Sequence, residues 1–142
     1  MPERAANLRA ELILKAMIAV GSADGGLEGR ELSLIQQVYE DQAERPITRE
    51  EIAEVSQEST RDGLLAELYA AAPVLDRETK EEIIRAAYLT LLADDRIAAE
   101  ERKKLKDIAM ALRVPEIHFG AILEDLALWL EVDGQRRQDG ST

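Results

Sequence analysis

Four carboxylates, arranged as two pairs with the same spacing, are the residues best suited to chemistry. Asp24 precedes Glu31 by seven positions, and Asp94 precedes Glu101 by seven positions. If the two segments lie side by side, the like charges either raise one another's pKa or hold a cation between them. Ca²⁺ and Mg²⁺ prefer carboxylate and backbone carbonyl oxygens as ligands. The two pairs therefore predict a divalent-cation site, for calcium or magnesium, with Asp24, Glu31, Asp94 and Glu101 as its ligands.

A purely structural role explains the same four residues. An Asp after the last turn of a helix readily forms a side-chain-supported turn, and a Glu in the first turn of the next helix caps its N–H groups. The N-cap positions would then be Glu28 and Ala98, neither of which is Ser or Thr. The twelfth position counted from Asp24 is Ile35, so this segment is not an EF-hand loop, and Arg96 places a cation beside the second pair. Both interpretations stay open.

Paired carboxylates could also serve metal-dependent hydrolysis through general acid–base catalysis. Such an enzyme usually carries many acidic and histidine side chains on the inner faces of its helices, whereas the inward positions here are Leu, Ile and Ala. His118 is the single histidine, and the absence of Cys excludes a thiol nucleophile and a cysteine-bound metal centre. We therefore expect a protein without catalytic activity and keep the hydrolase as the alternative.

The charge of the chain limits its partners. Its 18 Lys and Arg against 29 Asp and Glu give a net charge of −11 over 142 residues. Such a protein repels nucleic acid and anionic lipid, so we expect a protein partner with a basic surface and no nucleic acid. Charges interrupt the N-terminal segment, and no apolar stretch approaches the roughly 20 residues of a membrane span. The sequence predicts a cytoplasmic protein without direct membrane insertion and leaves its oligomeric state open.

The elements that position these residues are helices. Apolar residues recur at intervals of three and four almost throughout, and no segment alternates as a strand would. The pattern predicts an all-α fold of about seven helices in a compact bundle. Residues 1–132 form one domain, and 133–142, which lack large apolar side chains, form a flexible tail. Five of the predicted helices span about 3–23, 28–42, 60–72, 76–93 and 98–112, and two more begin at Thr48 and at Pro115. Thr48 and Glu51 have the spacing of a capping box, and Tyr69 is predicted to face inward.

An internal repeat relates the two acidic segments. Shifting the chain by 70 positions aligns Ile13 with Ile83 and Ala16 with Ala86, and it also aligns the two acidic pairs. Each copy reads as a helix, an Ala-Asp turn, one apolar residue and then a Glu that opens another helix. The sequence therefore predicts two pseudo-repeated helix-turn-helix halves, at about 8–42 and 78–112.

At these turns the chain resembles the TerB-like tellurite-resistance family. The resemblance rests on Ala-Asp-Gly-Gly-Leu at 23–27 with Glu31, and on Ala-Asp-Asp-Arg-Ile at 93–97 with Glu101, and it covers about residues 8–130. It implies a small, internally duplicated all-helical fold linked to resistance against tellurite and chemical stress. It also implies an acidic, metal-binding surface and membership of a membrane-linked complex, with the cytoplasmic face of a membrane protein as a partner. A related domain precedes the J-domain in some co-chaperones. The resemblance therefore also leaves a purely structural or co-chaperone-like module as an alternative.

Overall fold

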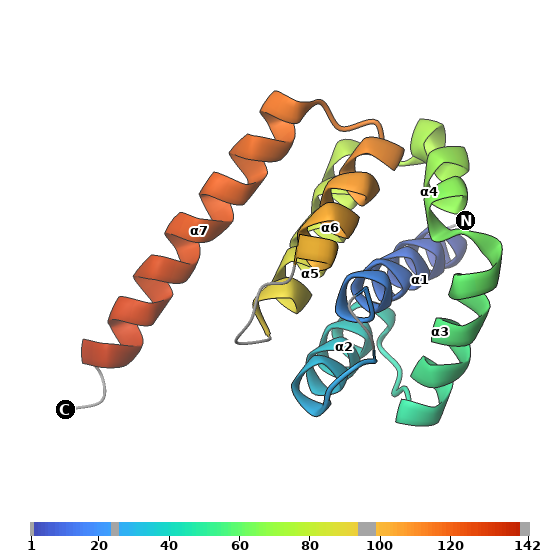
Figure 1. The fold of residues 1–142 in the computed structure, drawn as a ribbon, viewed down its shortest axis with the longest axis horizontal. Coiled ribbons are helices and arrows are strands. Elements are labelled where there is room, and N and C mark those ends of the chain that lie inside the picture. Colours follow the sequence, from blue (N-terminus) through green and yellow to red (C-terminus); the bar gives the residue numbers. More distant parts are fainter. Residues whose placement is uncertain (1, 24–25, 94–98, 140–142) are drawn as a thin grey trace.

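Helices make up the whole regular structure of the described residues. The computed structural model describes residues 2–23, 26–93 and 99–139, and no strand occurs in these ranges. The elements, shown in Figure 1, are α1 (Pro2–Gly21), α2 (Gly29–Ala43), α3 (Arg49–Asp62), α4 (Leu64–Ala71), the 3-10 turn η1 (Ala72–Val74), α5 (Arg77–Leu92), α6 (Ala99–Ala111) and α7 (Glu116–Asp139). The all-α prediction is confirmed.

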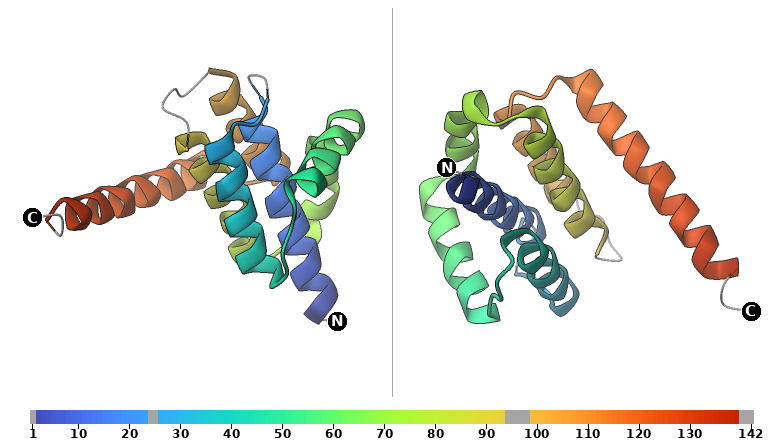
Figure 2. Two further views of the ribbon diagram at one scale, coloured as in Figure 1. Left: turned by 90° about the horizontal axis from the view of Figure 1, so that it is seen from below. Right: turned by 180° about the vertical axis from the view of Figure 1, so that it is seen from behind.

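Helix α1 lies at the centre of the bundle. It packs against α2, α3, α4, α5 and α6, and its contact with α5 is the most extensive between any two helices. Between Ala10 and Val20 almost every side chain is buried, including Leu12, Ile13 and Met17. A helix that is buried over most of its surface is stable only when other elements surround it, and α2 to α6 do so here (Figures 1 and 2).

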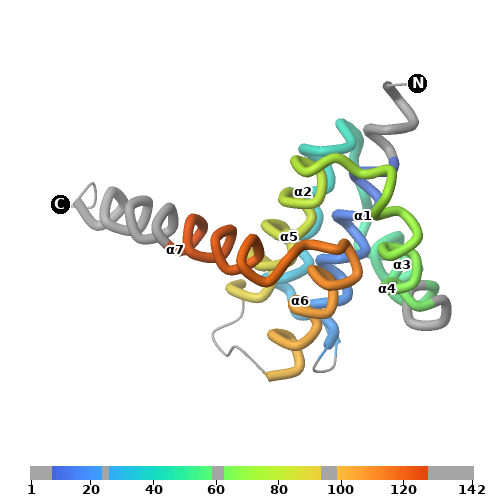
Figure 3. The backbone as a smooth tube through the Cα atoms, turned by 90° about the horizontal axis from the view of Figure 1, so that it is seen from above, coloured from blue at the N-terminus to red at the C-terminus, as the bar shows by residue number. Residues whose placement is uncertain are grey.

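The C-terminal ends of α1 and α5 meet at one end of the molecule. Gly21, the last residue of α1, lies so close to α5 that a Cβ built on it would stand 3.2 Å from Cγ2 of Thr90. Thr90 is fully buried, and its hydroxyl donates to the carbonyl of Ala86 at 3.0 Å. The chain therefore leaves α1 and α5 side by side on the way to α2 and α6 (Figure 3).

Two predicted helix limits differ from the observed ones. The sequence predicts a fourth helix from about residue 60, but α3 continues to Asp62 and α4 begins only at Leu64. The break falls at Gly63, whose φ of 69° lies in the left-handed region that glycine adopts without strain. Helix α7 continues to Asp139, well into the segment predicted as a flexible tail.

No helix within the described residues combines the length and the apolar composition needed to cross a membrane.

Candidate functional site

Glu31 lies at the start of α2 against the end of α1. Its Oε1 accepts the backbone N–H of Glu28 at 3.1 Å, so the predicted N-cap position and the reach of Glu31 back to it are confirmed. Only 3% of Glu31 is exposed. A Cβ added to Gly21 would stand 2.6 Å from Cδ2 of Leu27 and 2.8 Å from Oε2 of Glu31, so the missing side chain of Gly21 leaves the space that Leu27 and this carboxylate occupy.

Glu101 takes the corresponding position in the first turn of α6, and it is fully buried. The helices before the two turns also end alike. The N–H of Ala23 donates to the carbonyl of Val20 at 3.2 Å, and the N–H of Ala93 donates to the carbonyl of Thr90 at 3.2 Å. Val20, Ala23 and Glu31 thus precede Thr90, Ala93 and Glu101 by 70 residues each, and the pseudo-repeat of the two halves stays a prediction.

The two remaining predicted ligands, Asp24 and Asp94, lie outside the described residues, as do Arg96 and Ala98. Among the residues that are described, no group of three or more Asp, Glu or His side chains is arranged to hold a metal ion. That search covers only Glu31 and Glu101 of the four predicted ligands. The complete cation site therefore stays a prediction.

His118 connects α7 to the first turns of α5. It is half-buried, and its Nε2–H donates to Oε1 of Glu81 at 3.1 Å. Nη2 of Arg77 donates to Nδ1 of His118, also at 3.1 Å, while Nε of Arg77 pairs with Glu81 at 3.2 Å. The neutral imidazole with its proton on Nε2 satisfies both bonds. The three polar side chains therefore fasten α7 to α5.

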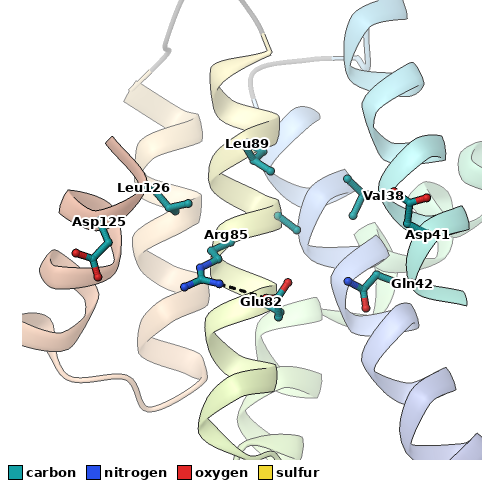
Figure 4. A pocket seen from close by; sticks show the side chains of 9 residues that line it. Val38, Asp41, Gln42, Glu82, Arg85, Leu89, Asp125 and Leu126 are labelled. Atoms are coloured by element: carbon teal, nitrogen blue, oxygen red, sulfur yellow. Dashed lines mark hydrogen bonds and ion pairs between the residues drawn. The ribbon is translucent and has the colours of Figure 1, made fainter. Parts of the chain in front are cut away.

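A groove with an apolar floor and an acidic rim separates α2 from α7, with α5 between them (Figure 4). Its volume is about 530 Å³. The apolar side chains come from all three helices, and the charged ones stand around them. The lining residues are Val38, Asp41 and Gln42 of α2, Glu82, Arg85, Ala86 and Leu89 of α5, and Asp125 and Leu126 of α7.

This groove was not predicted from the sequence, because no linear signal joins its three helices. Each contributes only one or two apolar residues beside an acid, which is the ordinary pattern at the edge of a buried helix face. The excess of acidic residues was the single signal that pointed toward it. It indicated an acidic surface but not its place.

No protein-family model, curated protein or solved structure matches this chain. The likeness to the TerB-like family thus rests on the residues of the two turns alone.

Proposed function

We propose that the chain is a non-catalytic acidic module that holds a divalent cation, calcium or magnesium, at its paired turns and docks a basic protein surface. Following the TerB-like resemblance, we assign it to tellurite or chemical-stress resistance, within a complex at the cytoplasmic face of a membrane protein. The cation would order the two turns, and the acidic surface of the helices would meet the partner.

The observation that carries this proposal is the position of the Glu31 carboxylate against the C-terminal end of α1. The last carbonyls of a helix lack intrahelical partners and carry a partial negative charge. The first turn of α2 favours the Glu31 carboxylate, whereas the C-terminal end of α1 repels it, and a bound cation would relieve that repulsion. Carboxylate and carbonyl oxygens are also the ligands that Ca²⁺ and Mg²⁺ prefer.

The second pair of residues supports a shared site. Glu101 is buried in the first turn of α6 as Glu31 is in that of α2. Gly21 at the end of α1 lies beside Thr90 in the last turn of α5, so the two helices end close together. Asp24 and Asp94 follow these helix ends in the sequence, where they could complete a ligand set from both halves.

Thermal unfolding tests the proposal. Protein treated with EDTA is titrated with Ca²⁺, Mg²⁺, Mn²⁺ and Zn²⁺ at constant ionic strength, and the melting temperature is recorded. We expect a saturable rise for one of these ions, since a ligand at about 100 times its Kd stabilises the folded state by about 2.7 kcal/mol. The double variant Asp24→Ala, Asp94→Ala should lose the rise. Gly21→Ala should weaken it while keeping every carboxylate, because the new methyl group would displace both Leu27 and Glu31.

The double variant Glu50→Ala, Glu54→Ala is the matched control, because it removes two exposed acids from α3 and changes the net charge equally. It should respond to cations as the wild type does. A wild-type melting temperature that no cation raises would contradict cation binding. If Asp24→Ala, Asp94→Ala then lowered the stability without changing any binding, the acids would be structural turn residues. The hydrogen bond from the Glu28 N–H to Glu31 favours this alternative.

A further inference from the structure

We propose that the groove between α2, α5 and α7 receives an amphipathic helix of a partner protein. The apolar stripe of that helix enters the groove, and its flanking Lys and Arg side chains meet the acidic rim. This inference names the docking site and the kind of ligand for the partner binding proposed above. It rests on the proposed function in one respect, namely that the partner is basic.

The floor of the groove is suited to apolar side chains. Val38 of α2 and Leu89 of α5 are half-buried and line it, together with the nearly buried Ala86 and Leu126. The volume of about 530 Å³ lies in the range of binding pockets that bury most of their ligand. Grooves formed between helices commonly accept a further helix through apolar residues spaced by three and four.

The rim selects for positive charge. Asp41 and Asp125 stand on opposite sides of the groove, on α2 and α7, and both are exposed (Figure 4). Within the ranges that the structure describes, neither of these two carboxylates has an ion-pair or hydrogen-bond partner. Glu82 pairs with Arg85 at 3.3 Å, so the single cation of the rim is already engaged by an acid. Lys and Arg beside an apolar stripe complement this arrangement.

The same charges argue against other occupants. A second copy of the chain would bring its own net charge of −11 to an acidic rim. An anionic lipid surface would be repelled for the same reason. A basic amphipathic helix is the ligand that gains from both the floor and the rim.

A fluorescein-labelled model peptide tests the inference directly. The peptide carries Leu at helical spacing on one face and Lys on the other, and its binding is followed by fluorescence anisotropy in EDTA at low and high salt. Asp41→Asn, Asp125→Asn should weaken binding about tenfold and flatten its salt dependence, since rim charges act mainly through long-range attraction. Leu89→Gln should weaken it to a similar extent at both salt concentrations, because its effect is on the apolar contact.

The matched control is Glu50→Gln, Glu54→Gln, which removes two acids from the exposed face of α3. It should bind the peptide about as tightly as the wild type. Equal binding by the rim variant and this control would overturn the inference, because the peptide would then follow net charge alone. Asp41 and Asp125 are exposed, so the rim variant keeps the test valid even if Leu89→Gln unfolds the protein.

Two further outcomes separate this inference from the proposed function. If wild type and all variants bind the peptide equally, docking of a basic partner stands but the groove is not its site. If the wild type fails to bind the peptide at all, both the groove as a docking site and the docking of a basic partner are contradicted. The proposed cation binding is tested separately by thermal unfolding, because peptide binding is measured in EDTA. Sedimentation of the wild type without peptide examines self-association, and a dimer abolished by Leu89→Gln would overturn the inference in favour of a second copy.

Discussion

A single carboxylate fixes the first turn of α5. Asp76 is the N-cap residue, and its Oδ1 accepts the backbone N–H of Thr79 at 2.8 Å. The hydrogen bond from the Thr79 side chain, followed by that from its backbone, lowers the pKa of Asp76 below its ordinary value of 3.8. The charged form is therefore favoured in the folded state. Because this pKa is lower in the folded chain than in the unfolded one, the stabilisation is complete above pH 3.8 and is lost as the pH falls through the folded-state pKa.

This carboxylate makes a pH-dependent prediction possible. Asp76→Asn keeps an oxygen acceptor for the helix cap but does not titrate. We expect wild type and Asp76→Asn to differ by a constant free energy of unfolding at neutral pH, and this difference should shrink once the pH falls below 3.8. Urea unfolding at a series of pH values measures it, with Glu54→Gln on α3 as the control. A difference unchanged down to pH about 3 would contradict a role for the charge.

Local spacing predicted the residues that act within one turn of a helix. The box of Thr48 and Glu51 is confirmed, since each side chain accepts the backbone N–H of the other at 3.1 Å. Tyr69 was predicted inward and is 55% exposed, with the Arg113 guanidinium 4.5 Å from its ring centre. Helix α4 has only 8 residues, so spacing alone does not fix which face is buried. An Arg from another segment then covers the ring.

At the scale of elements, α7 is held by a small number of contacts. Ile122 and Leu126 are its buried apolar residues in the described side chains, and His118 adds the polar connection to α5. Helix α7 forms one wall of the groove (Figure 4). The strength of its attachment to α5 thus decides how constant the width of the groove is.

His118→Ala should loosen α7 without unfolding the bundle. Losing one exposed and one half-buried hydrogen bond should cost about 1 kcal/mol, which corresponds to about fivefold faster amide exchange in residues 116–126. Exchange in the buried α1 should stay unchanged. The control is Lys106→Gln, whose ion pair with Glu116 at 3.8 Å joins α6 to α7 through two exposed side chains and should contribute little. Equal exchange in His118→Ala and the wild type, measured by mass spectrometry, would show that the apolar contacts alone hold α7.

The groove could not be predicted from the sequence patterns of the separate helices. Val38, Leu89 and Leu126 were each assignable to a helix, but their common surface depends on how far α2 and α7 stand apart across α5. Crossing angles and distances between helices follow from the interlocking of many side chains and leave no periodic signal in the chain. The repeat, by contrast, indicated where the two acidic turns should lie relative to their own helices.

At the scale of the whole molecule, the helical periodicity was enough to predict the fold class, because it persists through most of the chain. The central place of α1 also follows from its composition: Leu12, Ile13, Leu14 and Met17 leave few polar positions for solvent. The approach of Gly21 to Thr90 could not be predicted, since it joins segments far apart in sequence through the shape of one glycine.

The net charge of −11 makes a prediction that belongs to the molecule as a whole. Self-repulsion favours expansion, so raising NaCl from about 20 mM to about 500 mM should stabilise the fold by about 1 kcal/mol, or a few °C in Tm. Differential scanning calorimetry at pH 7 measures this rise, which should be gradual and equal for NaCl and KCl. A Tm that falls with salt would mean that ion pairs such as Lys15–Glu67 outweigh the repulsion.

The central position of α1 has a consequence for the order in which the chain folds. The ribosome makes α1 before its most extensive packing partner, α5, which is complete only at Leu92. During this interval the nascent polypeptide carries an apolar helix whose permanent cover has not been synthesised, a state prone to association with other chains. Contacts so distant in sequence also slow folding compared with helical proteins built from neighbouring hairpins. The α1 core is therefore completed only after α5 has emerged.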